Sequence, residues 1–114
     1  MSHLSILPTV LRDADLLASS LQAIGLQPRW QGQLEGFAAE RRSVELQVTL
    51  AGGESLGWAR QQDGSLALVA DLQRLSRSTR LQALLAVITR RYAAQKALLD
   101  AARQLGGVEV SVSF

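Results

Sequence analysis

The chain has 114 residues, enough to bury the core of one domain, and we expect residues 1–114 to form a single domain. It contains no cysteine, which excludes disulfides, thiolate metal sites and cysteine nucleophiles. The net charge of +2 is unevenly spread: residues 1–71 carry 5 Arg and 8 acids (−3), residues 72–103 carry 6 Arg, 1 Lys and 1 acid (+6), and Glu109 adds −1. A basic final third on an acidic body suits an acidic partner.

No segment has the features of a membrane span or a leader. The longest apolar run covers residues 83–88, against the roughly 20 residues that a membrane helix needs. The N-terminus lacks a charged region followed by an apolar stretch. The sequence therefore predicts a soluble, unexported protein.

The N-terminal part predicts a short strand and a helix. Leu4 and Ile6 alternate with polar residues up to Pro8, which ends the strand. Asp13 then suits a helix N-cap, and Gly25 a left-handed helix end that folds Leu26 back onto Leu21. Between them, apolar residues recur at helical spacing: Leu16, Leu17, Leu21 and Ile24.

The middle of the chain predicts further strands. Residues 28–37 mix polar and apolar residues with two glycines, which favours a strand at Trp30 and a loop after it, and residues 40–42 favour a charged turn. Residues 44–50 alternate strictly and predict a strand with one buried and one wet face. Gly52 and Gly53 then predict a turn.

Residues 56–61 and 65–71 predict a hairpin around Asp63 and Gly64, with two possible registers. A two-residue turn pairs Trp58 with Val69 and splits the apolar set between the two faces. A three-residue loop with left-handed Gly64 pairs Trp58 with Leu68 and collects the apolar residues on one face. We prefer the second register, because burial is worth about 1.5 to 3 kcal/mol per large side chain.

Residues 72–79 predict a short helical turn or loop, and residues 79–107 one long amphipathic helix that a glycine pair ends. The helix has an apolar stripe: Leu81, Leu84, Leu85, Ile88, Tyr92, Gln95, Leu98, Leu99, Ala102 and Leu105. We expect the rest of the chain to cover this stripe. Residues 108–114 alternate and predict a final strand in the sheet.

These elements follow one another as strand, helix, strand, three further strands, helix and strand. Because hairpins dominate, the sequence predicts a two-layer α+β domain with a mainly antiparallel sheet of about five strands and two helices on one face.

Several stretches together resemble a known family: MSHLSI, LRDADLLASSLQAIG, LGW before DGSLALVAD, and ITRRYAAQKALLDAARQLG before a valine-rich strand. In this order and spacing the chain resembles the hypothetical chloroplast reading frame thirty-five family, which occurs in cyanobacteria and some algal plastids. The resemblance implies a cytoplasmic or stromal protein of a photosynthetic lineage, with no activity or cofactor to carry over. The chain departs from the family pattern at Leu4, Leu72 and Gln73, where aromatic residues are usual, so no site built on those rings is expected.

Motifs for catalysis, metals or cofactors are absent from the sequence. His3 is the only histidine, which excludes metal sites with two imidazoles, and no phosphate-binding glycine loop occurs. We therefore assign no catalytic, metal or cofactor-binding residues. Asp71 ends a strand beside a predicted loop and is a candidate polar site, although it also suits the N-cap of the turn that follows.

The basic residues of the final third form the candidate interaction face: Arg74, Arg77, Arg80, Arg90, Arg91, Lys96 and Arg103. Arginine offers a planar fork that fits carboxylates and phosphates. Our leading hypothesis is a non-enzymatic interaction or assembly factor with an unidentified protein partner. The alternatives are RNA or DNA binding through the same residues, and a small-ligand or enzymatic site near Asp71. Nucleic-acid domains usually add exposed aromatics, and this chain has five aromatic residues in all.

Overall fold

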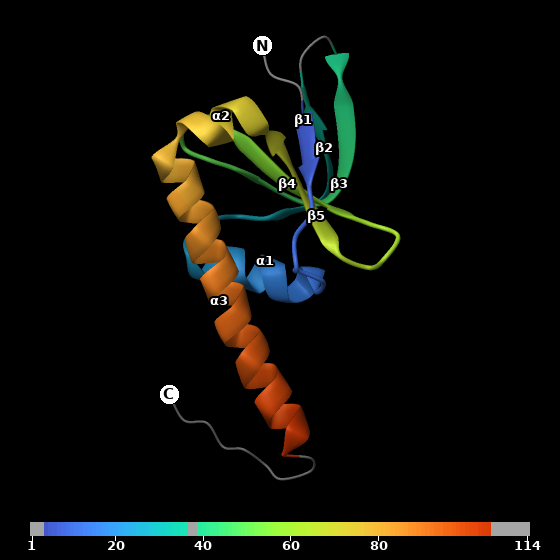
Figure 1. Ribbon diagram of the computed structural model, residues 1–114, viewed down its shortest axis with the longest axis vertical. Helices are drawn as coiled ribbons and strands as arrows, with labels where there is room; N and C mark the ends of the chain where they lie inside the picture. Colours follow the sequence, from blue (N-terminus) through green and yellow to red (C-terminus); the bar gives the residue numbers. More distant parts are fainter. Residues whose placement is uncertain (1–3, 37–38, 106–114) are drawn as a thin grey trace.

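The computed structural model describes residues 4–36 and 39–105, and Figure 1 traces their path. Strands and helices follow in the order β1 (Leu4–Leu7), α1 (Ala14–Ala23), β2 (Arg29–Glu35), β3 (Arg41–Thr49), β4 (Ser55–Arg60), β5 (Leu66–Asp71), α2 (Leu72–Arg77) and α3 (Thr79–Gln104). The five strands form one antiparallel sheet in the order β1-β5-β4-β3-β2. The predicted α+β class is confirmed, and the predicted helical turn after Asp71 is α2. The final strand predicted at 108–114 lies outside the described residues.

The hairpin of β4 and β5 has the register that burial favours. Trp58 pairs with Leu68, and Arg60 pairs with Leu66. Gly64 has φ +88, and its N–H donates to Gln61 O at 3.0 Å, as a loop with a left-handed glycine requires. The preference for the three-residue loop is therefore confirmed.

Helix α1 begins and ends as its sequence predicts. The Asp13 carboxylate accepts a hydrogen bond from Leu16 N at 3.1 Å. At the other end Gly25 has φ +89, and the N–H of Leu26 donates to Leu21 O at 3.0 Å. This Schellman motif folds Leu26 against the core.

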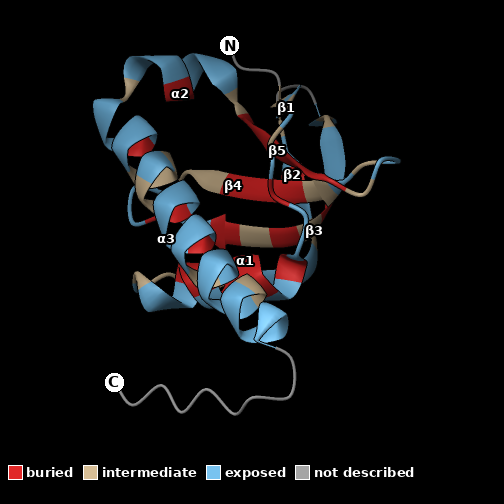
Figure 2. Ribbon diagram, turned by 60° about the horizontal axis from the view of Figure 1, so that its bottom comes forward, coloured by how far each residue is buried: buried red, intermediate tan, exposed pale blue. Residues whose placement is uncertain are grey.

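Helices α1 and α3 cover one face of the sheet, and the main core lies between them and the strands (Figure 2). Trp58 is 1% exposed at its centre. The sheet contributes the following buried residues to this core: Leu46, Val48, Leu50, Leu56, Trp58, Leu66, Leu68 and Ala70. Two helices on one face were predicted, and this layering is confirmed.

The opposite face of the sheet has a smaller apolar cluster that the sequence did not predict. Leu34, Val44 and Val69 form it, with Leu4 packed against them. Val44 therefore lies on the face opposite Leu46, although residues two positions apart share a face in a regular strand, so the prediction that residues 44–50 bury a single face is wrong at Val44. The change of face occurs beside Gln31 of β2, which has φ 55. Its neighbours Trp30 and Gly32 pair with Leu46 and Val44, the two residues that lie on opposite faces.

The β2–β3 hairpin curls over this second face. A Cβ on Gly57 would lie 2.6 Å from Val44 Cγ1 and 2.8 Å from Leu34 Cδ1, so the hairpin side chains touch the bare backbone of β4. At the hairpin tip, Glu40 Oε1 accepts from Leu4 N at 2.9 Å and joins it to β1. The prediction of a loop after Trp30 is wrong, because β2 continues to Glu35, and so is the charged turn at 40–42, where β3 begins at Arg41.

Helix α3 is only partly covered. Leu81, Ile88 and Tyr92 are buried, and no residue between 93 and 105 is. Figure 1 shows α3 crossing α1 and continuing beyond it. At 26 residues α3 is about 39 Å long, whereas the 10-residue α1 spans about 15 Å. Within residues 4–36 and 39–105, the expectation that the chain covers the stripe therefore holds for its first half and fails for its second half.

Candidate functional site

A pocket of about 680 Å³ lies among the outer part of β2, the β3–β4 turn, the end of β5, α2 and the start of α3. Its apolar lining comes from Leu4, Leu34, Leu56, Ala70, Leu75 and Leu81. Its polar lining comes from Gln33, Glu35, Gln47, Glu54, Ser55, Asp71 and Arg74. The volume lies within the range typical of small-molecule sites.

Ion pairs and caps engage the carboxylates of this pocket. Glu54 Oε1 pairs with Arg80 Nη2 at 3.2 Å, while Glu54 Oε2 is buried with no hydrogen-bond partner among the described residues. Glu35 lies 3.9 Å from Arg41 in an exposed pair. The pocket therefore combines charged side chains with an apolar floor, and both of its glutamates already have counter-charges.

Asp71 serves as the N-cap of α2, as one of its two interpretations predicted. Its Oδ1 accepts from Arg74 N at 3.2 Å. The same residue lines the pocket, and so does the Arg74 side chain. The structure thus brings Asp71 and one of the seven predicted basic residues together at a single cavity.

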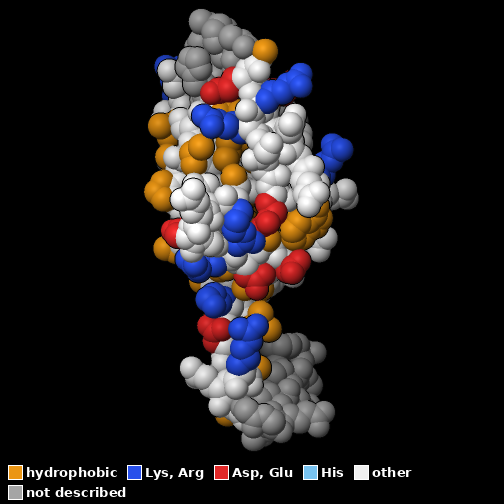
Figure 3. All heavy atoms as spheres, turned by 90° about the vertical axis from the view of Figure 1, so that its right-hand side faces the viewer, with side chains coloured by type: hydrophobic (Ala, Val, Ile, Leu, Met, Phe, Trp, Pro, Cys, Tyr) orange, Lys and Arg blue, Asp and Glu red, His pale blue; other side chains and the backbone are white. Residues whose placement is uncertain are grey.

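The seven basic residues are all exposed but do not share one face. Arg74 and Arg77 belong to α2 and the other five to α3. At roughly 100° per residue, Arg80 and Arg91 flank the buried stripe on one side, and Lys96 and Arg103 flank it on the other. Arg90 points away from the stripe. Figure 3 draws the side of the molecule opposite α2, and there too basic side chains are interspersed with acidic ones.

Two of these basic residues have partners. Arg80 pairs with Glu54, and Lys96 lies 3.4 Å from Asp100 one turn further along α3. Among the described residues, the other five form no ion pair: Arg74, Arg77, Arg90, Arg91 and Arg103.

Residues 96–105, the last turns of α3 with its C-cap Leu105, carry exposed leucines beside these cations, and we call them the outer end of α3. Leu98 is 56% exposed, Leu99 44% and Leu105 50%. The last side-chain hydrogen bond to the body comes just before, where Ser20 Oγ donates to Gln95 Oε1 at 3.2 Å. The outer end thus presents an apolar stripe bordered by Lys96 and Arg103.

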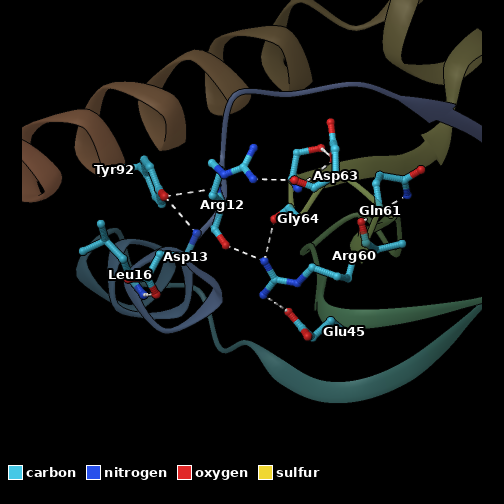
Figure 4. Close-up of polar contacts among 11 residues, drawn as sticks. Arg12, Asp13, Leu16, Glu45, Arg60, Gln61, Asp63, Gly64 and Tyr92 are labelled. Carbon is cyan, nitrogen blue, oxygen red and sulfur yellow. Dashed lines mark hydrogen bonds and ion pairs between the residues drawn. The ribbon is translucent and has the colours of Figure 1, made fainter.

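A second polar cluster, which the sequence did not indicate, ties α1, β4 and α3 together (Figure 4). Arg60 donates to Glu45 Oε2 at 2.7 Å, to Gly64 O at 2.8 Å and to Arg12 O. The buried hydroxyl of Tyr92 accepts from the backbone N–H groups of Arg12 and Asp13, at 3.1 and 3.0 Å. The hydrogen bonds of Arg60 and Tyr92 all join parts of the chain to one another, so we interpret this cluster as structural.

The β4–β5 turn beside this cluster is stabilised by Asp63. The hydroxyl and the backbone N–H of Ser65 both donate to Asp63 Oδ1, at 2.6 and 2.9 Å. These hydrogen bonds lower the pKa of the Asp63 carboxyl below its usual range. The interpretation of Asp63 as a turn residue is confirmed.

Most of the chain matches a known protein family. A family model described as a protein of unknown function, DUF1257, matches residues 20–112. The chain belongs to the DUF1257 family. No curated protein and no solved structure matches it. The matched part of this DUF1257 chain includes the pocket residues after Leu4 and all seven basic residues.

The described part of the DUF1257 chain has neither a cluster of metal ligands nor a membrane-spanning helix. Residues 4–36 and 39–105 hold no group of three or more potential metal ligands. His3 lies outside this described part. Even α3, its longest helix, has no apolar window that would cross a bilayer.

Proposed function

We propose that this DUF1257 domain is a non-enzymatic interaction or assembly factor of a photosynthetic lineage, cytoplasmic or stromal, whose α3 docks into an apolar groove of a protein partner. The observation that carries the proposal is the outer end of α3, with exposed leucines on a helix that continues beyond α1. Amphipathic helices of this kind bind grooves through apolar residues three and four positions apart.

The basic residues beside the leucine stripe favour a partner whose groove has an acidic rim. Arg103 borders the leucine stripe and has no ion pair among the described residues. Lys96 borders it too, although Asp100 already neutralises part of its charge. An acidic groove rim would accelerate association and orient the helix, whereas the leucines would supply most of the affinity.

The test is affinity capture with the full chain from a nuclease-treated cyanobacterial lysate. The wild-type chain should retain a stoichiometric protein, and the double substitution Leu98→Gln and Leu99→Gln should lose it, because glutamine keeps the helix and removes the apolar stripe. Val10→Gln is the matched control, since Val10 is an exposed apolar residue, 84% accessible, that does not belong to the outer end of α3. If nothing is retained in gentle salt, or if the leucine variant retains the same protein, the proposal is wrong.

A mobility-shift assay with the full chain tests the alternative of RNA or DNA binding. Trp30 is 48% exposed, and the hollow that it lines contains more acids than bases. The acids are Asp13, Asp15 and Glu45, and the bases are Arg12 and Arg60. Those acids disfavour a phosphate backbone beside this aromatic ring. A mobility shift at low salt that disappears in the double substitution Arg90→Ala and Arg91→Ala would replace the protein partner with a nucleic acid.

A small-ligand site is the second candidate, and the pocket that contains Asp71 and Arg74 favours it. The pocket has the volume of a ligand site, an apolar floor and polar groups from several elements. Among the described residues of its lining, Glu35 and Glu54 form ion pairs and Asp71 caps α2. Binding of a ligand is therefore the function that this cavity supports.

A further inference from the structure

The pocket between β2 and α2 carries an inference about ligand chemistry, which rests on the second candidate function above. Its apolar floor joins Leu34 of the smaller cluster to Leu56 and Leu81 of the main core, each 3% exposed or less. An apolar floor favours a ligand with a hydrocarbon part, because a wholly polar molecule would gain little from leaving water there.

The charged side chains of the pocket lining determine which polar group of a ligand would bind there. Glu54 already pairs with Arg80, and Glu35 with Arg41. Arg74 is the remaining charged side chain of the lining that forms no ion pair and caps no helix among the described residues. A ligand therefore meets a cationic fork at the pocket wall.

We propose that the pocket binds a small organic monocarboxylate with an apolar body, whose carboxylate is held by Arg74. A guanidinium offers two parallel N–H donors to one carboxylate, which fixes its orientation as well as its charge. Three acidic side chains also line the pocket, so a singly charged carboxylate is repelled less than a doubly charged phosphate. The Gln33 and Gln47 amides line the same pocket and supply further donors.

Octanoate, octanol and octylamine form a matched set of probes, with one hydrocarbon chain and three different head groups. Each is titrated into the full chain at concentrations below micelle formation, and backbone amide shifts are followed in two-dimensional NMR spectra. Octanoate should give saturable shifts confined to the pocket, at residues such as Gly36, Gly53 and Arg74. Octanol should bind more weakly, and octylamine weakest of the three.

Substitution of Arg74 distinguishes a specific carboxylate site from non-specific hydrophobic binding. Arg74→Gln should weaken octanoate binding about tenfold, the loss expected for one charge-assisted contact at a partly exposed site, and leave octanol unchanged. Arg77→Gln is the control, because Arg77 lies on the same helix outside the pocket lining. Both side chains are exposed, so neither variant should impair folding.

Three results would overturn the proposal: no saturable shifts at the pocket, octylamine binding as tightly as octanoate, or octanoate binding that Arg74→Gln does not weaken. The double substitution at Leu98 and Leu99 should leave octanoate binding unchanged. Failure of the ligand site and failure of the α3 interaction are thereby separate observations.

Discussion

The two ends of α3 share one sequence pattern and differ in what covers them. The inner end, residues 79–92, places Leu81, Ile88 and Tyr92 in the main core. The outer end, residues 96–105, continues the same three-and-four spacing with leucines that remain about half exposed. Periodicity therefore identifies the apolar face of a helix, but the length of its neighbours decides how much of that face is buried.

The largest expected contrast comes from truncating one apolar residue at each end. Ile88→Ala should lower the free energy of unfolding by about 2–5 kcal/mol, because Ile88 is 1% exposed and its loss leaves a cavity. Leu98→Ala should change it by no more than about 0.5 kcal/mol, as for other surface substitutions. Urea unfolding of both variants measures the difference. Equal losses would mean that the outer end is covered in solution.

The inner end also depends on the curved sheet beneath it, and Gly57 tests that curve. Gly57→Ala should destabilise the protein by about 1–3 kcal/mol, because the new methyl group would overlap Val44 and Leu34. The double-mutant cycle with Val44→Ala provides the control. If the clash is the cause, the two losses are less than additive, and simple additivity would contradict it.

Tyr92 marks the boundary between the two ends, and its hydroxyl tests how that boundary is held. Tyr92→Phe keeps the ring in the core but leaves the N–H groups of Arg12 and Asp13 without their acceptor. The expected cost is about 1–2 kcal/mol of unfolding free energy. Hydrogen exchange should accelerate at those two amides in particular. Unchanged exchange there would show that another group, such as water, replaces the hydroxyl.

The sequence predicts best those parts of the fold where two local signals agree. In the β4–β5 hairpin, the left-handed glycine and the apolar set require the same register, and the structure has it. Asp13 and Gly25 define α1 in the same way. By contrast, the side chains of β2 alternate irregularly, because Gln31 adopts a left-handed conformation. The sequence does not indicate this conformation, because the residue is not a glycine.

The candidate site was only partly predictable. Asp71 stands out because it ends a strand, and Arg74 because it belongs to a basic run. The Glu54–Arg80 pair joins residues 26 positions apart, a contact that only the packing of the β3–β4 turn against α3 creates. The pocket is likewise a product of packing, since its lining comes from seven separate segments of the chain.

The smallest expected effect concerns the outer end by itself. Lys96 and Asp100 form its described ion pair, with the cation on the N-terminal side, the weaker orientation for a pair one turn apart. Lys96→Gln should therefore raise amide exchange rates in residues 97–105 by only about 1.5- to 2-fold, equivalent to roughly 0.2–0.5 kcal/mol. Exchange in β4 and β5 serves as the internal control and should not change. A loss of global stability in this variant would contradict the separation of the two ends, because a helix end with no packing partner unfolds without disturbing the core.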